Sequence, residues 1–537
     1  MKYTKVLFGL ELKEKLQKGV DLVADAVKLT LGAKGQNAIL DNGAITITND
    51  GVFIASRIIP QDEFEHTGAK VIKQVADNTN RIAGDGTTTS VVLTQALIRE
   101  GLKQVKRPSS KWGFLLSLFN RKETKAGIEV KRDIEIATKE AIRLLDEISM
   151  PVDGIDQLKH VATISAESVP IGKLIAETIH KIGKDGVVLV EESQSTEISV
   201  TNIEGLQIDR GYASHNLVKN QKRMETEYRD CPVLIINKAI ATQEEIIPII
   251  TQMIEKKIKE FVLIADEFSE GVIGMFVVNK YHDSFHVLPI KSPSFGDQRK
   301  EILEDIAVFT GATVMSDQKG TPLESFELSH LGSVDRVLAT KDETLFVGGK
   351  YDKTIFDERL ERMKNELAGL TDAWEISKLK ARIAKMTGSI AILSVGAQTE
   401  TEMKYLKLKI EDAVHATKNA LAEGIVSGGG VTLAQIAKKL RAGGYSEIVS
   451  KALEQPLRQI AINAGDPDGA EILKQVQETG CGYNAKTREL VINMIDEGII
   501  DPVKVTKTAL LNASSASAIF LTTEVAVVDN YLDDVKK

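Results

Sequence analysis

The stretch RIAGDGTTTSVVLTQALIREGL, residues 81–102, places a Gly-Asp-Gly turn and three consecutive threonines directly before a long segment with helical spacing of apolar residues. The N–H groups at a helix start have no intrahelical partners and carry partial positive charge, so they can bind a phosphate. Glycine allows close approach of the backbone, and Asp85 offers the carboxylate that Mg²⁺ prefers. The stretch therefore predicts a phosphate site.

The alternative interpretation of this stretch is a glycine turn with a threonine N-cap. Three threonines in a row favour the phosphate site, because one cap needs only one hydroxyl. The turn is not a Walker A loop, since no Gly-Lys-Ser/Thr closes it. Other polar turns could share the site, although each is a weak signal alone: TLGAKGQN (30–37), TNDG (48–51), VSGGGVTL (426–433), GYNA (482–485) and IIDP (499–502).

Length and composition limit the class of protein. The chain has 537 residues, more than one hydrophobic core usually organises, so several domains are expected. Its net charge is −8 and its basic residues are dispersed, which argues against a nucleic-acid partner. Two distant cysteines form no disulfide framework, and the most apolar short run, residues 112–119, is too short to span a bilayer. We therefore expect a cytoplasmic protein with no membrane partner.

Hydrophobic periodicity separates the outer thirds of the chain from its centre. Helical spacing is found over 10–31, from the NDG turn to about Arg81, over 128–148 and again beyond 402, and a hairpin is expected at 38–48. In the centre, strands at 261–266, 285–291 and 312–316 alternate with helices at 270–280 and 298–310, which indicates a parallel sheet covered by helices. Two antiparallel charged helices are expected over 355–387. The pattern predicts an α/β domain inserted into a split, mostly helical domain.

The motifs taken together resemble those of a known family. VADAVKLTLGAKGQN, GDGTTTSVVLTQAL, GKLIAETIHKIGKDGVVLVEE, DRGY, SPSFGDQRKEILEDIAVFTG, EDAVHATKNALAEGIVSGGGVTL, PLRQIAINAG and NMIDEGIIDPVKVTK are, in this order, similar to the blocks of group I chaperonins of the GroEL type. The resemblance extends over nearly the whole chain. It implies an ATP-dependent chaperone, an ATPase whose ring-shaped chamber captures, encloses and refolds non-native polypeptides.

The resemblance also implies a multidomain α and α/β fold with three domains. A mostly helical equatorial ATP-binding domain would comprise 1–147 and 423–537. A small α/β intermediate domain, acting as a lever, would comprise 148–204 and 389–422. An α/β apical domain at 205–388 would bind client polypeptides and a co-chaperonin. The implied partners are further copies of the chain, in a seven-membered ring and two stacked rings, and a GroES-type co-chaperonin that closes the chamber.

Carried over position by position, the resemblance assigns the nucleotide site, with ATP, Mg²⁺ and K⁺ as cofactors. Asp85 would bind Mg²⁺, and Asp412, helped by Asp50, would polarise the attacking water. The residues expected around the phosphates are Thr30, Leu31, Gly32, Ala33, Asn49, Gly86, Thr87, Thr88 and Thr89. Those expected at the adenine and ribose are Gly429, Asn484, Ala485 and Asp501.

Two central segments carry more apolar residues than one buried helical stripe needs, namely 242–258 and 271–280. One interpretation is a pair of helices sandwiched within the α/β domain. The resemblance instead implies an exposed groove that binds non-native chains through burial of apolar surface. Its expected residues are Tyr212, Leu217, Ile247, Ile250, Ile273, Val277 and Val278.

Several positions depart from the family pattern. Ala33 replaces a proline and Asn49 replaces a lysine beside the expected nucleotide. Asn216 replaces an aromatic residue of the groove. Arg210 and Glu400 match a pair that bridges neighbouring subunits, whereas a second pair, within the intermediate domain, has become Val169 and Lys409, for which altered ring cooperativity is expected.

The largest departure is an insertion of roughly 16 residues, judged against the length of the family blocks, within 107–127. We hypothesise that its apolar run, residues 112–119, either remakes or prevents the contact between rings; the alternative is a disordered segment or a surface helical hairpin. The Gly-Met-rich tail of bacterial members is absent. Two other functions remain open: a ring that binds clients but hydrolyses ATP poorly, and an unrelated ATP-dependent enzyme.

Overall fold

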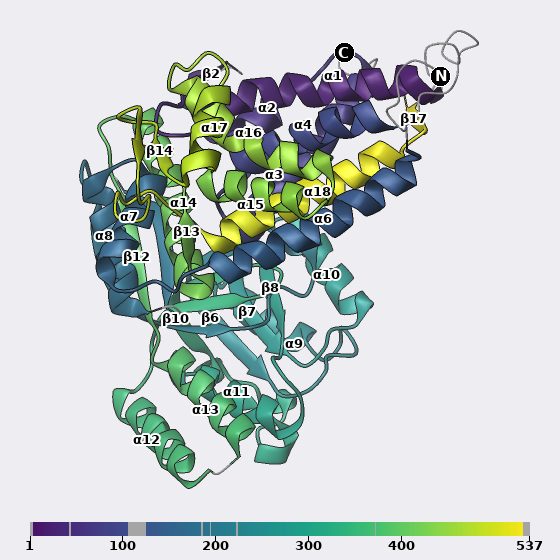
Figure 1. The fold of residues 1–537 in the computed structure, drawn as a ribbon. Helices are drawn as coiled ribbons and strands as arrows, with labels where there is room; N and C mark the ends of the chain where they lie inside the picture. The colour runs from purple at the N-terminus through teal and green to yellow at the C-terminus, as the bar shows by residue number, and fades with distance from the viewer. Residues whose placement is uncertain are drawn as a thin grey trace. The chain divides into compact units, whose positions relative to one another are not determined.

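The computed structural model describes residues 4–41, 45–105, 125–183, 186–193, 195–221, 224–370 and 372–529. Most of the insertion expected within 107–127 and the chain end from 530 lie outside these residues. The chain forms two compact units (Figure 1). The first comprises 1–184, 190–199 and 394–537, and the second comprises 185–189 and 200–393. The second unit contains the span expected for the apical domain, while the division into three domains stays a prediction.

The first unit is mostly helical, and its long helices pack through continuous apolar faces. On α1, for example, Leu12, Leu16, Val20 and Val23 recur at helical spacing and are buried against α3 and α4. No helix among the described residues is long and apolar enough to cross a membrane. The helices of this unit are α1 (Gly9–Val27), α2 (Gly51–Arg57), α3 (Glu63–Ala83), α4 (Thr87–Gln104), α6 (Gly127–Ile148), α7 (Ile155–Ala166), α8 (Val169–Ile182), α14 (Glu400–Glu423), α15 (Val431–Ala442), α16 (Glu447–Asn463), α17 (Ala470–Thr479) and α18 (Val503–Thr522).

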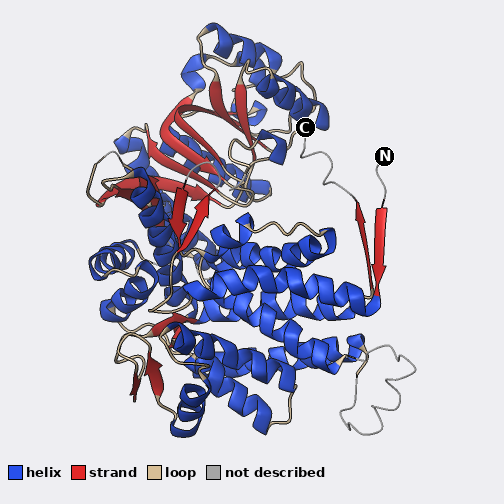
Figure 2. Ribbon diagram, turned by 90° about the horizontal axis from the view of Figure 1, so that it is seen from above, coloured by secondary structure: helices blue, strands red, loops and turns tan. Residues whose placement is uncertain are grey.

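Short antiparallel strand pairs, red in Figure 2, form local hairpins in this unit and also connect segments that are distant in sequence. β1 (Thr4–Phe8) pairs with β17 (Val525–Asp529), and β14 (Gly482–Asn484) pairs with β15 (Glu489–Val491). β13 (Ile425–Ser427) pairs with β16 (Ile500–Pro502), so the glycine-rich loop after β13 lies beside Asp501. The expected hairpin is confirmed as β2 (Ala38–Asp41) and β3 (Ile45–Thr48).

The single helix expected from the NDG turn to Arg81 is wrong, because the chain breaks between α2 and α3. Pro60 lies in the break, where it cannot donate a backbone hydrogen bond. Asp62 then caps α3, its Oδ1 accepting from the N–H groups of Phe64 at 2.9 Å and Glu65 at 3.1 Å.

The second unit is built on a mixed sheet in the order β4-β12-β5-β11-β10-β6-β7-β8, with β9 pairing β6. Side chains alternate between two apolar clusters: Val233 and Ile235 belong to one, Leu234 and Ile236 to the other, so both faces of the sheet are covered. Its strands are β4 (Val187–Glu192), β5 (Ser199–Ile208), β6 (Thr226–Ile236), β7 (Glu260–Ala265), β8 (His286–Lys291), β9 (Val314–Met315), β10 (Gly332–Ala339), β11 (Thr344–Gly349) and β12 (Ser389–Val395).

The expectation of a parallel sheet holds for only part of this sheet. β6, β7, β8 and β9 are parallel, joined through α9 (Ile247–Glu255), α10 (Glu270–Tyr281) and α11 (Gly296–Thr310). β5, β11, β10 and β6 pair antiparallel, and of these only β10 and β11 are directly connected. This antiparallel half of the sheet was not predicted from the sequence.

The two charged helices expected over 355–387 are confirmed as α12 (Lys353–Gly369) and α13 (Ala373–Met386), which Figure 1 shows as a pair. Both are fixed to α11 by a buried aspartate. The Asp305 side chain is 1% exposed and accepts from Arg359 Nε at 3.0 Å and from Arg382 Nη2 at 3.1 Å. A carboxylate at this depth requires such charged partners.

Candidate functional site

The Gly-Asp-Gly turn joins two long helices of the first unit. α3 ends at Ala83, and α4 begins at Thr87 after Gly86, whose φ of 79° lies in the left-handed region. A Cβ at Gly86 would lie 2.5 Å from Val505 Cγ1, so no other residue fits there. The start of α4 has no side-chain cap. The threonines are therefore not used as an N-cap, and the first N–H groups of α4 stay available to a ligand.

Two other turns meet the start of α4. The Thr30 Oγ1 atom, at the end of the short 3₁₀ helix Lys28–Thr30, lies 3.3 Å from Thr88 Oγ1. A Cβ at Gly51, the first residue of α2, would lie 2.7 Å from Thr88 Oγ1 and 3.0 Å from Thr87 Oγ1. Thr30 and the threonines 87–89 are all partly exposed. The structure thus brings three of the predicted segments together around a set of hydroxyl groups.

A residue that the sequence analysis missed holds the first of these turns. Asn463, at the end of α16, donates from Nδ2 to the carbonyl oxygens of Lys28 at 3.0 Å, Leu29 at 3.4 Å and Leu31 at 2.9 Å. The exposed Gly32 and Ala33 follow directly. One amide therefore orders the backbone beside Thr30. The apolar periodicity of α16 gives no sign of this role for Asn463.

Four aspartates from four segments approach one another beside the threonines. Asp50 caps α2, with Oδ1 accepting from Val52 N–H at 2.9 Å, and Asp85 Oδ1 accepts from Gly86 N–H at 2.5 Å. Burial raises the pKa of both carboxyls. Burial, with the charges of Asp85 and Asp50, raises the pKa of Asp412 on α14 well above its usual range. Burial and the charge of Asp85 raise the pKa of Asp501 on β16 to about 7.

The end of α7 also reaches this group. Ser165 Oγ donates to Asp85 Oδ2 at 3.1 Å, and Glu167 Oε1 lies 2.8 Å from Lys409 Nζ on α14. Glu167 Oε1 accepts as well from Asn49 Nδ2 at 2.9 Å. The family comparison paired Lys409 with Val169, and the altered ring cooperativity expected from that change stays a prediction. In the structure, the carboxylate beside Lys409 belongs to Glu167, two residues before Val169.

The segments expected at the base and ribose lie next to one another. Asp501 Oδ1 would be 2.9 Å from a Cβ at Gly428, and the Tyr483 carbonyl oxygen would be 3.8 Å from a Cβ at Gly429. Ala485 is buried in an apolar cluster against which Leu31 also packs. The Asn484 side chain is engaged in its own turn, accepting from Lys486 N–H at 3.0 Å.

In the second unit, the residues expected in the client groove do not all reach the surface. Ile247 on α9 and Val278 on α10 are exposed, and Ile273 and Val277 are half-buried. Tyr212, Leu217 and Ile250 are buried in the apolar clusters of the sheet. For these three, the expected place in an open groove is wrong, because each fills the core beneath α9 and α10 or the other face of the sheet.

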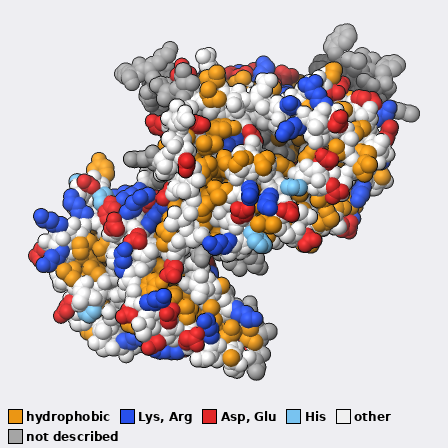
Figure 3. All heavy atoms as spheres, turned by 90° about the vertical axis from the view of Figure 1, so that its left-hand side faces the viewer, with side chains coloured by type: hydrophobic (Ala, Val, Ile, Leu, Met, Phe, Trp, Pro, Cys, Tyr) orange, Lys and Arg blue, Asp and Glu red, His pale blue; other side chains and the backbone are white. Residues whose placement is uncertain are grey.

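Arg210 and Glu400, expected to bridge subunits, are both exposed. Glu400 forms an ion pair with Lys404, one turn further along α14. On the face drawn in Figure 3, basic and acidic side chains are interspersed. Charge density therefore does not single out a contact surface on that face.

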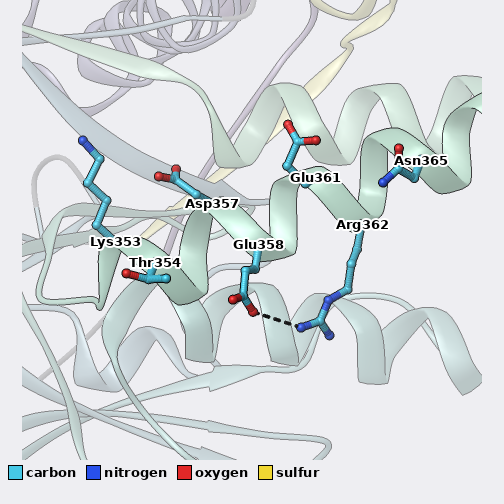
Figure 4. Close-up of a pocket in the computed structure, with 7 residues that line it drawn as sticks. All are labelled: Lys353, Thr354, Asp357, Glu358, Glu361, Arg362 and Asn365. Carbon is cyan, nitrogen blue, oxygen red and sulfur yellow. Dashed lines mark hydrogen bonds and ion pairs between the residues drawn. The ribbon is translucent and has the colours of Figure 1, made fainter.

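A shallow groove runs along α12 of the second unit (Figure 4). Its side chains all come from this one helix, and Glu358 forms an ion pair with Arg362 at 3.4 Å. Lys353, Thr354, Asp357, Glu358, Glu361, Arg362 and Asn365 line it. No second segment contributes a polar group to this lining, so the convergent site is the one in the first unit.

Comparisons with known proteins identify the fold and the family of this chain. The crystal structure of the chaperonin gp146 from bacteriophage EL 2 (Pseudomonas aeruginosa), in the presence of ATP-BeFx, matches in crystal form II with a TM-score of 0.67 at 21% sequence identity. The match covers 97% of this chain and 99% of that chain; crystal form I gives a TM-score of 0.60 with the same identity and coverage. The expected GroEL-like multidomain fold is thus confirmed. The model of the TCP-1/cpn60 chaperonin family matches residues 23–110 and 124–530, and this chain belongs to that family.

Proposed function

We propose that this chaperonin binds and hydrolyses Mg-ATP at the site formed by α4, α2, α14 and β16, and that the cycle drives capture and refolding of non-native polypeptides. One observation carries the proposal: the uncapped start of α4 faces threonine hydroxyls and lies beside the carboxylates of Asp50, Asp85 and Asp412. The ATP analogue in the crystals of gp146 supports a nucleotide as the ligand.

The donor set fits Mg²⁺ bound together with a nucleotide. Among the described residues, no group of three or more His, Cys, Asp or Glu side chains is arranged to hold a metal ion alone. Mg²⁺ prefers one or two carboxylates plus phosphate oxygens, so Asp85 would hold it with the nucleotide. Bound there, Mg²⁺ would offset the charge of the phosphates. The N–H groups of α4 and the hydroxyls of Thr30 and Thr87–Thr89 would bind the phosphate oxygens.

In hydrolysis, a water molecule attacks the γ-phosphorus, the bond from that phosphorus to the ADP oxygen breaks, and the water proton passes to Asp412. The raised pKa of Asp412 makes its carboxylate a stronger base than an exposed aspartate. Asp50 orients the water, and Gly429, Ala485 and Asp501 enclose the base and ribose. Because Asp412 lies on α14, hydrolysis depends on α14 being at the site.

The wider cycle follows the three-domain division of the sequence analysis. Residues 148–204 and 389–422 act as the lever, and 205–388 bind clients through Ile247, Ile273, Val277 and Val278. Exposed apolar side chains bind non-native chains without sequence specificity. Seven copies form a ring, a second ring stacks on it, and a GroES-type co-chaperonin closes the chamber.

The test is ATP turnover, measured beside refolding of a denatured client, for the wild type and for Asp412→Ala. We expect turnover to fall about a hundredfold or more, as for loss of a general base. Glu402→Ala, which removes an exposed carboxylate from the same helix, is the matched control and keeps wild-type turnover. Normal turnover in Asp412→Ala would contradict the assignment of the base, and client capture unaffected by nucleotide would contradict the cycle.

A further inference from the structure

Lys409 is partly buried beside the carboxylates, on the face of α14 that carries Asp412. The two residues are three positions apart, so their side chains share one face of the helix. The Lys409 side chain is 13% exposed, and its ammonium lies 2.8 Å from Glu167 Oε1. The Tyr405 hydroxyl, one turn earlier on α14, lies 3.5 Å from Glu167 Oε2. Lys409 is thus held at the end of α7, where Glu167 adopts a left-handed φ of 53°.

The ammonium acts on two carboxylates of other segments and on one carboxylate of α14 itself. Its positive charge lowers the pKa of Asp50, Asp85 and Asp412, against burial, which raises the pKa of each. Burial would lower the pKa of Lys409, but the charges of Glu167 and Asp412 outweigh it and raise that pKa. Lys409 is therefore charged at neutral pH and offsets part of the mutual repulsion among the aspartates.

The turn before Asp50 contributes no positive charge beside Glu167, because residue 49 is a neutral asparagine. Asn49 precedes Asp50, and its amide donates to the same Glu167 oxygen that lies against Lys409. Glu167 thus connects the neutral Asn49 with the cation from α14. A nucleotide arriving at the aspartates adds several negative charges to a partly buried space, which requires compensating positive charge.

We propose that Lys409 is a cation of the nucleotide site, which supplies from α14 the positive charge shared by the carboxylates and the phosphates of bound nucleotide. The inference rests on the proposed function and deepens it. Because this charge is covalently attached, the K⁺ expected from the family resemblance is dispensable for nucleotide binding. The cation and the base Asp412 also reach the site together, on one helix.

Three variants separate this role from that of a structural partner of Glu167. Lys409→Met removes both the charge and the ion pair. Glu167→Gln removes the ion pair but leaves the ammonium in place. Asn49→Lys combined with Lys409→Met returns a cation to the site from position 49, which contacts the same Glu167 oxygen as Lys409.

The measurement is equilibrium binding of a non-hydrolysable Mg-ATP analogue to the full chain, in choline chloride and in KCl at equal ionic strength. We expect Lys409→Met to weaken binding about tenfold in choline, as for the loss of one charge-assisted contact, with partial recovery in KCl. Glu167→Gln binds as the wild type or more tightly, and the double variant recovers most of the loss. The wild type binds equally well in both salts.

Equal weakening by Lys409→Met and Glu167→Gln would overturn the proposal, since it would make the lysine a structural partner only. Wild-type affinity in Lys409→Met would overturn it as well. If Lys409→Met does not fold, the salt comparison on the wild type decides, because a requirement for K⁺ contradicts a resident cation. A wild type that binds no Mg-nucleotide in either salt would instead contradict the proposed function, so the two failures are distinguishable.

Discussion

Ser165 donates a hydrogen bond from Oγ to Asp85 Oδ2 at 3.1 Å, which joins the end of α7 to the turn between α3 and α4. The bond lowers the pKa of Asp85 against the larger, opposite effect of burial. It stabilises the ionised carboxylate, which is the form that binds a cation. The proposed Mg²⁺ ligand is therefore tuned by a residue of the proposed lever.

Replacing Ser165 by alanine tests this coupling. Removing the hydroxyl costs about 1 kcal/mol of stabilisation of the ionised carboxylate, so we expect the Mg²⁺ concentration for half-maximal ATP turnover to rise about fivefold. Ser149→Ala is the matched control. Among the described residues, the exposed hydroxyl of Ser149 donates only to the Asp146 carbonyl, at 2.8 Å. An unchanged Mg²⁺ requirement in Ser165→Ala would show that the bond does not tune Asp85.

The three hydrogen bonds from Asn463 give a second prediction. Asn463→Leu leaves the carbonyls of Lys28, Leu29 and Leu31 without this donor, and we expect a stability loss of about 1–3 kcal/mol. The Thr30 turn then loses its shape, so KM for ATP rises more than kcat falls. Asn463→Asp should be at least as damaging, because it places a carboxylate against three carbonyl oxygens.

The exposed Asn365→Leu on α12 is the control for the leucine substitution and should leave both KM and stability unchanged. Steady-state kinetics and thermal melting of the full chain measure the two effects. A loss of stability in Asn463→Leu with unaltered KM would mean that the amide supports packing alone and does not shape the phosphate turn.

Sequence patterns anticipated the elements of this fold better than its site contacts. α6, β7 and β8 were predicted within a few residues because each buries a regularly spaced apolar stripe or run. Asn463, Ser165 and Glu167 were missed, since each acts through one hydrogen bond to a segment far away in sequence. Periodicity does not encode such contacts.

The errors have the same origin. The family resemblance assigned Ile250 to a groove, and the spacing of apolar residues on α9 could not show which of them faces the sheet. The comparison matched Lys409 with Val169 position by position, so it did not show that Glu167, two residues before Val169, contacts Lys409. The antiparallel half of the sheet was not predicted because two of its pairs, β6 with β10 and β5 with β11, join strands that are far apart in sequence.

The raised pKa of Asp501 predicts a pH-dependent stability. Its pKa rises from an ordinary 3.8 to about 7 through burial and the charge of Asp85, so the folded state favours the protonated form. This contribution is fully present below the unfolded pKa and is lost as the pH rises through about 7. Asp501→Asn, neutral at every pH, should therefore melt higher than the nucleotide-free wild type at about pH 8, with the gain shrinking toward about pH 5.

Thermal melting across this pH range provides the measurement. Asp153→Asn, at an exposed position of the same unit, is the control and should not change the pH profile. A stabilisation by Asp501→Asn that is equal at all pH values would indicate improved packing and would exclude the titration of Asp501 as its cause.

The Asp305 cluster of the second unit predicts a large loss of stability. Asp305→Ala leaves Glu301 as the one carboxylate of this cluster that pairs with Arg359 and Arg382. Removing one partner of a buried ion pair costs about 3–5 kcal/mol of folding stability. We expect α12 and α13 to become accessible to protease. Asp297→Ala, on the same helix but almost fully exposed, should stay within about 0.5 kcal/mol of the wild type. Equal stability of the two variants would contradict the structural role of the cluster.

The different exposure of two isoleucines on α9 separates client binding from folding. Ile247 is 44% exposed and Ile250 is 4% exposed. Ile247→Ser should lower the capture of a denatured client several-fold while the melting temperature stays near that of the wild type, since exposed apolar contacts are lost but the core is intact. Ile250→Ser should destabilise the second unit by about 2–5 kcal/mol, because it removes packed apolar volume and buries a hydroxyl. Client capture and melting, measured on both variants, decide the matter: unchanged capture by a folded Ile247→Ser protein would remove α9 from the proposed client surface.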